Sequence, residues 1–85
     1  MDLEFLELEI KAAKADQKFH AEMLIEKLAT LDGLQVLDEI NANPTTVGKL
    51  LKEAHQEVKW YTGRVERDAK LLDVFYTARD ITQND

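Results

Sequence analysis

Apolar residues recur every three or four positions along two long stretches of the chain, residues 2–32 and 44–80. This spacing keeps them on one side of an α-helix, in which successive residues turn by about 100°. The pattern therefore predicts two long amphipathic helices. The main stripe of the first is Leu3, Leu6, Ile10, Ala13, Leu24, Leu28 and Leu31, and that of the second is Val47, Leu50, Leu51, Ala54, Val58, Tyr61, Val65, Ala69, Leu72, Phe75 and Tyr76.

Each stretch also carries apolar residues well away from its main stripe. A second helix can cover only one side of the first, so these additional stripes predict contact with another subunit or protein. Ala12 and Ala78 complete the stripes but are small. The larger residues, which we expect to anchor the interface, are Phe5, Leu8, Phe19, Met23, Trp60, Leu71 and Val74.

Local signals indicate where the helices begin and end. Gly33 suits the left-handed position that commonly follows a helix, which predicts that the first helix ends near residue 32. Residues 34–41 then form a short middle helix capped by Asp32. Asn43 followed by Pro44 is a favourable helix start. The polar tail, residues 81–85, is expected to fray.

Helices of about 30 and 35 residues are roughly 45 and 50 Å long and cannot fold back into a globule. We therefore expect a single all-α domain over residues 1–85, built as a long antiparallel helical hairpin with the short middle helix at the bend. One side of a two-helix seam stays open. Pairing of two hairpins into a four-helix bundle would close it, which predicts a homodimer.

Gln17 and His20 interrupt the main stripe of the first helix. Polar residues within a helical seam can fix register or oligomeric state at a cost in stability. Alternatively, both side chains reach the edge of the seam and contact water. The sequence leaves these two interpretations open.

The net charge of −6 is unevenly distributed over the 85 residues. Residues 1–43 hold ten acidic and four basic residues, whereas residues 44–85 hold seven of each. An acidic first half disfavours binding to a nucleic-acid backbone and favours a protein partner with a basic surface. There is no cysteine, no basic and apolar leader and no long uninterrupted apolar run. We therefore expect a cytoplasmic protein without a membrane partner, in the host cytoplasm if the source is viral.

Residues suited to catalysis are scarce. The chain lacks serine and cysteine and contains no glycine-rich phosphate loop. Neither histidine follows a glutamate at the three-residue offset that di-iron helical bundles use, and two histidines without cysteine are few for a zinc site. We expect no enzymatic activity, no cofactor and no metal ion.

The preferred functional interpretation is a small acidic helical module that regulates, inhibits or scaffolds a larger protein through helix-face contacts and self-association. One alternative is a helix-turn-helix regulator, with residues 34–40 as its first helix and the segment from Thr45 onward in the major groove. Only Lys49 and Lys52 would lie near the phosphates at the start of that segment. A second alternative is a structural component of a larger, for example viral, assembly.

Overall fold

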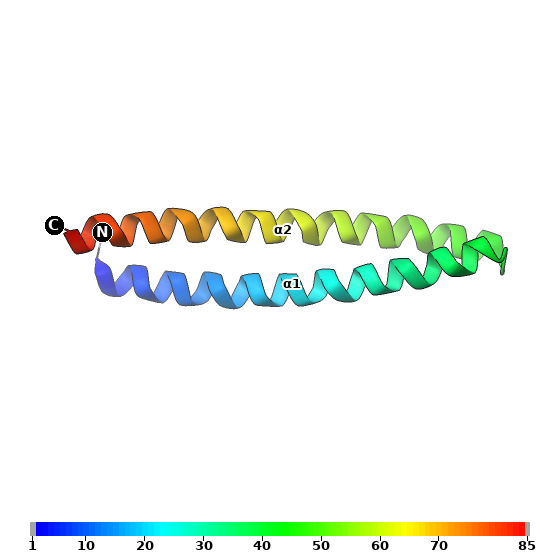
Figure 1. Ribbon diagram of the computed structural model, residues 1–85, viewed down its shortest axis with the longest axis horizontal. Coiled ribbons are helices and arrows are strands. Elements are labelled where there is room, and N and C mark those ends of the chain that lie inside the picture. Colours follow the sequence, from blue (N-terminus) through cyan, green and yellow to red (C-terminus); the bar gives the residue numbers. More distant parts are fainter. Residues whose placement is uncertain (1, 85) are drawn as a thin grey trace.

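The computed structural model describes residues 2–84, which form two antiparallel α-helices joined by a short turn at residues 40–43. α1 spans Leu3–Glu39 and α2 spans Pro44–Asn84. The two helices lie side by side over their whole length, with both chain termini at one end, here called the open end, and the turn at the other (Figure 1). The resulting rod measures 63 × 14 × 13 Å. Residues 2–84 contain no strand, in agreement with the predicted all-α hairpin.

The predicted break after residue 32 is wrong, because α1 continues through Gly33 to Glu39. A separate middle helix is therefore absent from the described residues, and so is the short first helix that a helix-turn-helix requires. Glycine in a helix interior costs about 0.5–1 kcal/mol relative to alanine. Leu31 is buried and Leu34 partly buried on either side of Gly33, and packing of these leucines against α2 offsets that cost.

The left-handed residue that ends α1 is Asn41, whose φ is 56°. The amide of Asn41 donates to the Asp38 carbonyl, and the amide of Ala42 donates to the Leu37 carbonyl, each at 3.0 Å. This pair of bonds is the Schellman arrangement, in which the last carbonyls of a helix are satisfied by the two residues that follow it. The stop expected at Gly33 therefore lies eight residues later.

α2 begins at Pro44, as the sequence predicted, and the carbonyl of Asn43 accepts its first bond from the Val47 amide at 3.0 Å. The prediction of a frayed tail is wrong for residues 81–84, which are helical. The Thr82 hydroxyl donates to the Ala78 carbonyl at 2.8 Å within this last turn. Asp85 lies outside the described residues.

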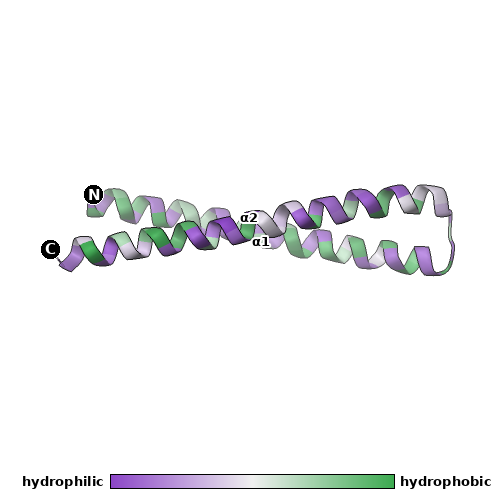
Figure 2. Cartoon of the chain, turned by 90° about the horizontal axis from the view of Figure 1, so that it is seen from above, coloured by the Kyte–Doolittle hydropathy of each residue, from purple (hydrophilic) through white to green (hydrophobic). Residues whose placement is uncertain are grey.

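The seam between the helices follows a heptad pattern, with buried or partly buried positions alternating three and four residues apart. Figure 2 shows the helices crossing near their midpoints, as two wound helices do. In α1 the seam positions are Leu6, Ile10, Ala13, Gln17, His20, Leu24, Lys27, Leu31 and Leu34, and in α2 they are Val47, Leu51, Ala54, Val58, Tyr61, Val65, Asp68, Leu72, Phe75, Arg79 and Thr82.

Four residues assigned to the main stripes are instead exposed: Leu3, Leu28, Leu50 and Ala69. Lys27 and Asp68 occupy the seam positions next to two of them. The seam is consequently more polar than predicted, and Ile10, Ala13 and Leu72 form a buried apolar cluster within it toward the open end.

Candidate interaction surface

Three polar contacts across the seam, a histidine–carboxylate hydrogen bond and two ion pairs, fix the register of the two helices. The closest joins His20 Nδ1 to the Asp68 carboxylate at 2.7 Å. Lys27 Nζ lies 2.8 Å from the Glu57 carboxylate, and this hydrogen bond raises the pKa of Lys27 above its ordinary value of 10.5. Nearer the open end, the Arg79 guanidinium lies 3.5 Å from the Glu7 carboxylate. Residues near the start of α1 therefore lie level with residues near the end of α2.

The two polar residues predicted for the seam are both partly buried there. His20 pairs with Asp68, whose side chain is only 8% exposed. Its ring also contacts aromatic neighbours, with centroids 5.5 Å from Phe19 and 6.3 Å from Trp60. The seam pair and the outer aromatic residues thus belong to one contact network at mid-length.

One side of the hairpin can be identified from a groove between the helices. The groove is lined by Thr30 of α1 and by Glu53 and Glu57 of α2, among others. In a pair of wound helices, residues seven apart remain on the same side. Met23 and Asp16 follow from Thr30 by such steps toward the open end, so they lie on the same side as the groove.

Steps of seven residues along α2, from Glu53 and Glu57 toward the open end, lead to a row of mainly apolar residues. This row therefore lies on the same side of the hairpin as the groove. In α1, residues Phe5, Ala12 and Phe19 lie one helical turn from the row that contains Asp16 and Met23. We call this surface the side face. It consists of Phe5, Ala12, Phe19 and Met23 from α1 and Trp60, Leu71, Val74, Ala78 and Ile81 from α2.

The structure places six of the seven predicted anchors at exposed positions. Phe19, Trp60 and Val74 retain 56%, 52% and 63% exposure, respectively, and Met23 alone is partly buried. Leu8 is 62% exposed, next to the side face on the back of α1. The hairpin thus leaves large apolar side chains uncovered in its open half. Toward the turn, Leu37 and Leu50 continue the same seven-residue rows and are 41% and 42% exposed.

Charges along the side face differ in sign between the helices. Asp2, which caps the start of α1, and Glu9 and Asp16 within α1 are spaced seven residues apart and form an acidic row. On α2, Arg64 and Arg67 interrupt the apolar row. None of these five residues takes part in the cross-seam polar contacts described above.

Beside the arginines, α2 has a shallow hollow over Gly63. It is bounded by Trp60, Arg64 and Arg67, and the Arg64 guanidinium lies 4.6 Å from the centre of the Trp60 ring. A methyl group added at Gly63 would meet no atom within 4 Å. The part of α2 that carries Trp60 therefore combines an exposed aromatic ring with positive charge.

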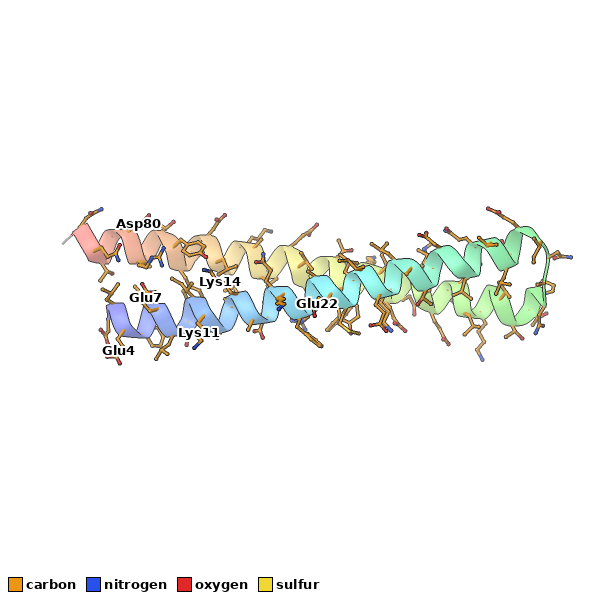
Figure 3. The ribbon with its side chains drawn as sticks, turned by 60° about the horizontal axis from the view of Figure 1, so that its bottom comes forward. Glu4, Glu7, Lys11, Lys14, Glu22 and Asp80 are labelled. Atoms are coloured by element: carbon orange, nitrogen blue, oxygen red, sulfur yellow. The ribbon has the colours of Figure 1, made fainter. Side chains whose placement is uncertain are left out.

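The opposite side of the hairpin is different in character. Glu7 and Lys14 extend toward α2, whereas Glu4 and Lys11 point away from it (Figure 3). Lys14 Nζ lies 5.7 Å from the centre of the Tyr76 ring. Exposed apolar residues on this side of α1 are Ile25 and Leu28, which are not part of the side face.

Other kinds of site were sought within residues 2–84. No group of three or more histidine, aspartate or glutamate side chains there is arranged to hold a metal ion. Neither helix, over the same residues, has an apolar segment of the length needed for a membrane crossing. Comparison with protein-family models, with curated proteins and with solved structures finds no match to this chain.

Sequence reasoning missed several residues of the surface and of the seam beneath it. Ile81, which is 60% exposed, was assigned to a frayed tail although it continues the spacing of Trp60, Arg67 and Val74. Asp68 was missed because Ala69 beside it fits an ideal helical wheel. A strict seven-residue count from Val47 along α2 would have identified Asp68 as a seam residue, and the same count from Trp60 would have identified Ile81 as a side-face residue.

Proposed function

We propose that this chain is a protein-binding module that uses its side face to hold a helix of another polypeptide. The observation that carries the proposal is the exposure of Phe19, Trp60, Leu71 and Val74 on one side of a hairpin whose seam is already closed. Large aromatic and aliphatic side chains gathered in one patch are the groups that dominate binding energy at protein interfaces.

The charges indicate which helix would fit. The acidic row of Asp2, Glu9 and Asp16 borders the α1 part of the side face. An apolar helical stripe bordered by arginine or lysine would complement it, whereas an acidic helix would be repelled. Complementary charge also speeds encounter, so the acidic first half of the chain would steer such partners toward this surface.

A fluorescently labelled synthetic helix tests the proposal directly. The probe is an amphipathic peptide with a leucine stripe flanked by arginines, and the control peptide keeps the stripe but replaces the arginines with glutamates. Fluorescence anisotropy should show binding of the first peptide and at least tenfold weaker binding of the second.

Variants of the hairpin locate the binding surface. Trp60→Ala combined with Leu71→Ala should weaken peptide binding by about tenfold or more, while helix content by circular dichroism stays nearly unchanged. The matched control is Ile25→Ala combined with Leu28→Ala on the opposite side, which should leave affinity within about twofold. Equal binding of both peptides, or equal loss in both double variants, would refute this assignment of the surface.

A further inference from the structure

An apolar helical stripe that carries arginines already exists within this chain, on the α2 part of the side face. We infer that the helix held by α1 is α2 of a second copy, so that two hairpins form a symmetric four-helix bundle. This inference rests on the proposed function and names its partner. A pair of identical hairpins buries the same surface on both subunits, which requires that surface to be self-complementary.

The charges decide which helices face each other. If α1 lay against the partner's α1, the acidic rows that contain Glu9 and Asp16 would be brought together, and like charges across an interface are strongly unfavourable. If α2 lay against the partner's α2, Arg64 and Arg67 would meet their own copies. Only the arrangement that places α1 against the partner's α2 sets acidic against basic residues on both sides of the symmetry axis.

The pairing of α1 with the partner's α2 also decides the direction of the second hairpin. A two-fold axis that sets α1 against the partner's α2 on both sides must run parallel to the helices, so both hairpins point the same way, with their open ends together. The apolar residues of the side face then meet, because Phe5–Met23 lie level with Trp60–Ile81 in the register set by Glu7–Arg79 and His20–Asp68. The two-fold axis then runs along the bundle, and each helix has antiparallel neighbours on both sides, as in other four-helix bundles.

This geometry specifies contacts. Because the two-fold axis runs along the bundle, equivalent residues of the two subunits lie at the same height along it. Asp16 then lies within about one turn of the partner's Arg67, and Phe5 within about one turn of the partner's Ile81. Phe19 lies at the level of the partner's Arg67 as well, where a guanidinium can stack on its ring.

The test is a charge exchange between Asp16 and Arg67, both of which are exposed within a single hairpin. The full chain of 9.8 kDa should run as a particle of twice that mass in sedimentation equilibrium. In Arg67→Glu the new carboxylate faces the partner's Asp16 twice per dimer, and in Asp16→Arg the new guanidinium faces the partner's Arg67 twice. Each variant alone should raise the dimer dissociation constant more than about tenfold.

Mixing the two variants should restore the dimer, because both contacts in the mixed pair again join opposite charges. Lys70→Glu on the back of α2 and Asp32→Arg on α1 are exposed and provide the same charge changes outside the side face, and both should remain dimeric. Circular dichroism establishes that every variant keeps its helix content.

Three results would overturn the inference: a monomeric wild-type chain at concentrations up to about 1 mM, dimeric single-charge variants, or a mixture that does not associate. A chain that stays monomeric yet binds the arginine-flanked peptide would reject the second copy as partner and retain the proposed function. If the Trp60→Ala and Leu71→Ala double variant dimerises with an unchanged dissociation constant, the side face is not the dimer interface.

Discussion

The buried contact between His20 and Asp68 is the most costly single feature of the seam. Asp68 is only 6% exposed, and its carboxylate must give up water to lie between two helices. The 2.7 Å bond to His20 Nδ1 compensates for that loss, because a buried acceptor with no partner is penalised by about 1–3 kcal/mol. Polar seam contacts of this kind disfavour sliding of one helix along the other, since any shift separates the two side chains.

Replacing only one residue of the His20–Asp68 pair should therefore destabilise the hairpin more than replacing both. We expect His20→Leu to lower the free energy of unfolding by about 1–3 kcal/mol, because the Asp68 carboxylate is left buried and unpaired. His20→Leu combined with Asp68→Leu should restore stability to the wild-type value or above, because the apolar seam becomes continuous. Urea denaturation at constant protein concentration measures the free energy of unfolding of the wild type, both single variants and the double variant. A double variant whose loss of stability equals the sum of the two single losses would contradict this expectation.

At the scale of the helices, their type and faces were predictable but not the details of their length and packing. An ideal helix drifts about 20° per heptad from a seam that repeats every seven residues. Over the eleven seam positions of α2 this drift moved the predicted stripe by one residue, to Ala69 in place of Asp68. When the two helices wind around each other, this drift is removed. Because winding is a property of the helix pair, a helical wheel drawn for one helix alone cannot show it.

Gly33 illustrates how packing overrides a local signal. Its backbone has no positive φ, and a methyl group there would meet no atom within 4 Å. Gly33→Ala should raise the free energy of unfolding by about 0.5–1 kcal/mol, and the reverse change Ala29→Gly, one turn earlier on the same helix, should lower it by a similar amount. Chemical denaturation followed by circular dichroism measures both. A destabilising Gly33→Ala would mean that α1 is interrupted at this position after all.

Asn41 carries the role that the sequence had suggested for Gly33. Left-handed backbone costs about 1–2 kcal/mol for ordinary residues and much less for asparagine or glycine. Because Asn41 has a φ of 56°, Asn41→Ala should reduce the free energy of unfolding by about 1 kcal/mol relative to Asn41→Gly. Equal denaturation midpoints for the two variants would show that α1 ends by a different arrangement in solution.

For the whole molecule, sequence reasoning gave the hairpin and its surplus of exposed apolar surface, because both follow from residue spacing along single helices. The side face could not be derived in this way. It requires knowing which residues of α1 lie level with which residues of α2, and that register depends on Asn41 ending α1 and on contacts such as His20–Asp68 across the seam. The acidic row and the two arginines acquire meaning only once this register places them at the same height on one side.

The direction of the two hairpins in the dimer can be measured with spin labels, because the chain has no cysteine of its own. A nitroxide attached through Gln83→Cys marks the open end. With both open ends together, the two labels are separated by little more than the bundle width, about 30 Å or less given a hairpin cross-section of 14 × 13 Å. In a head-to-tail pair they would be separated by about the rod length of 63 Å. A label at Glu22→Cys, near mid-length, serves as the control because both arrangements bring its copies to a similar short distance. Pulsed electron resonance distances near 60 Å for Gln83→Cys would show that the charges pair the hairpins in the opposite direction.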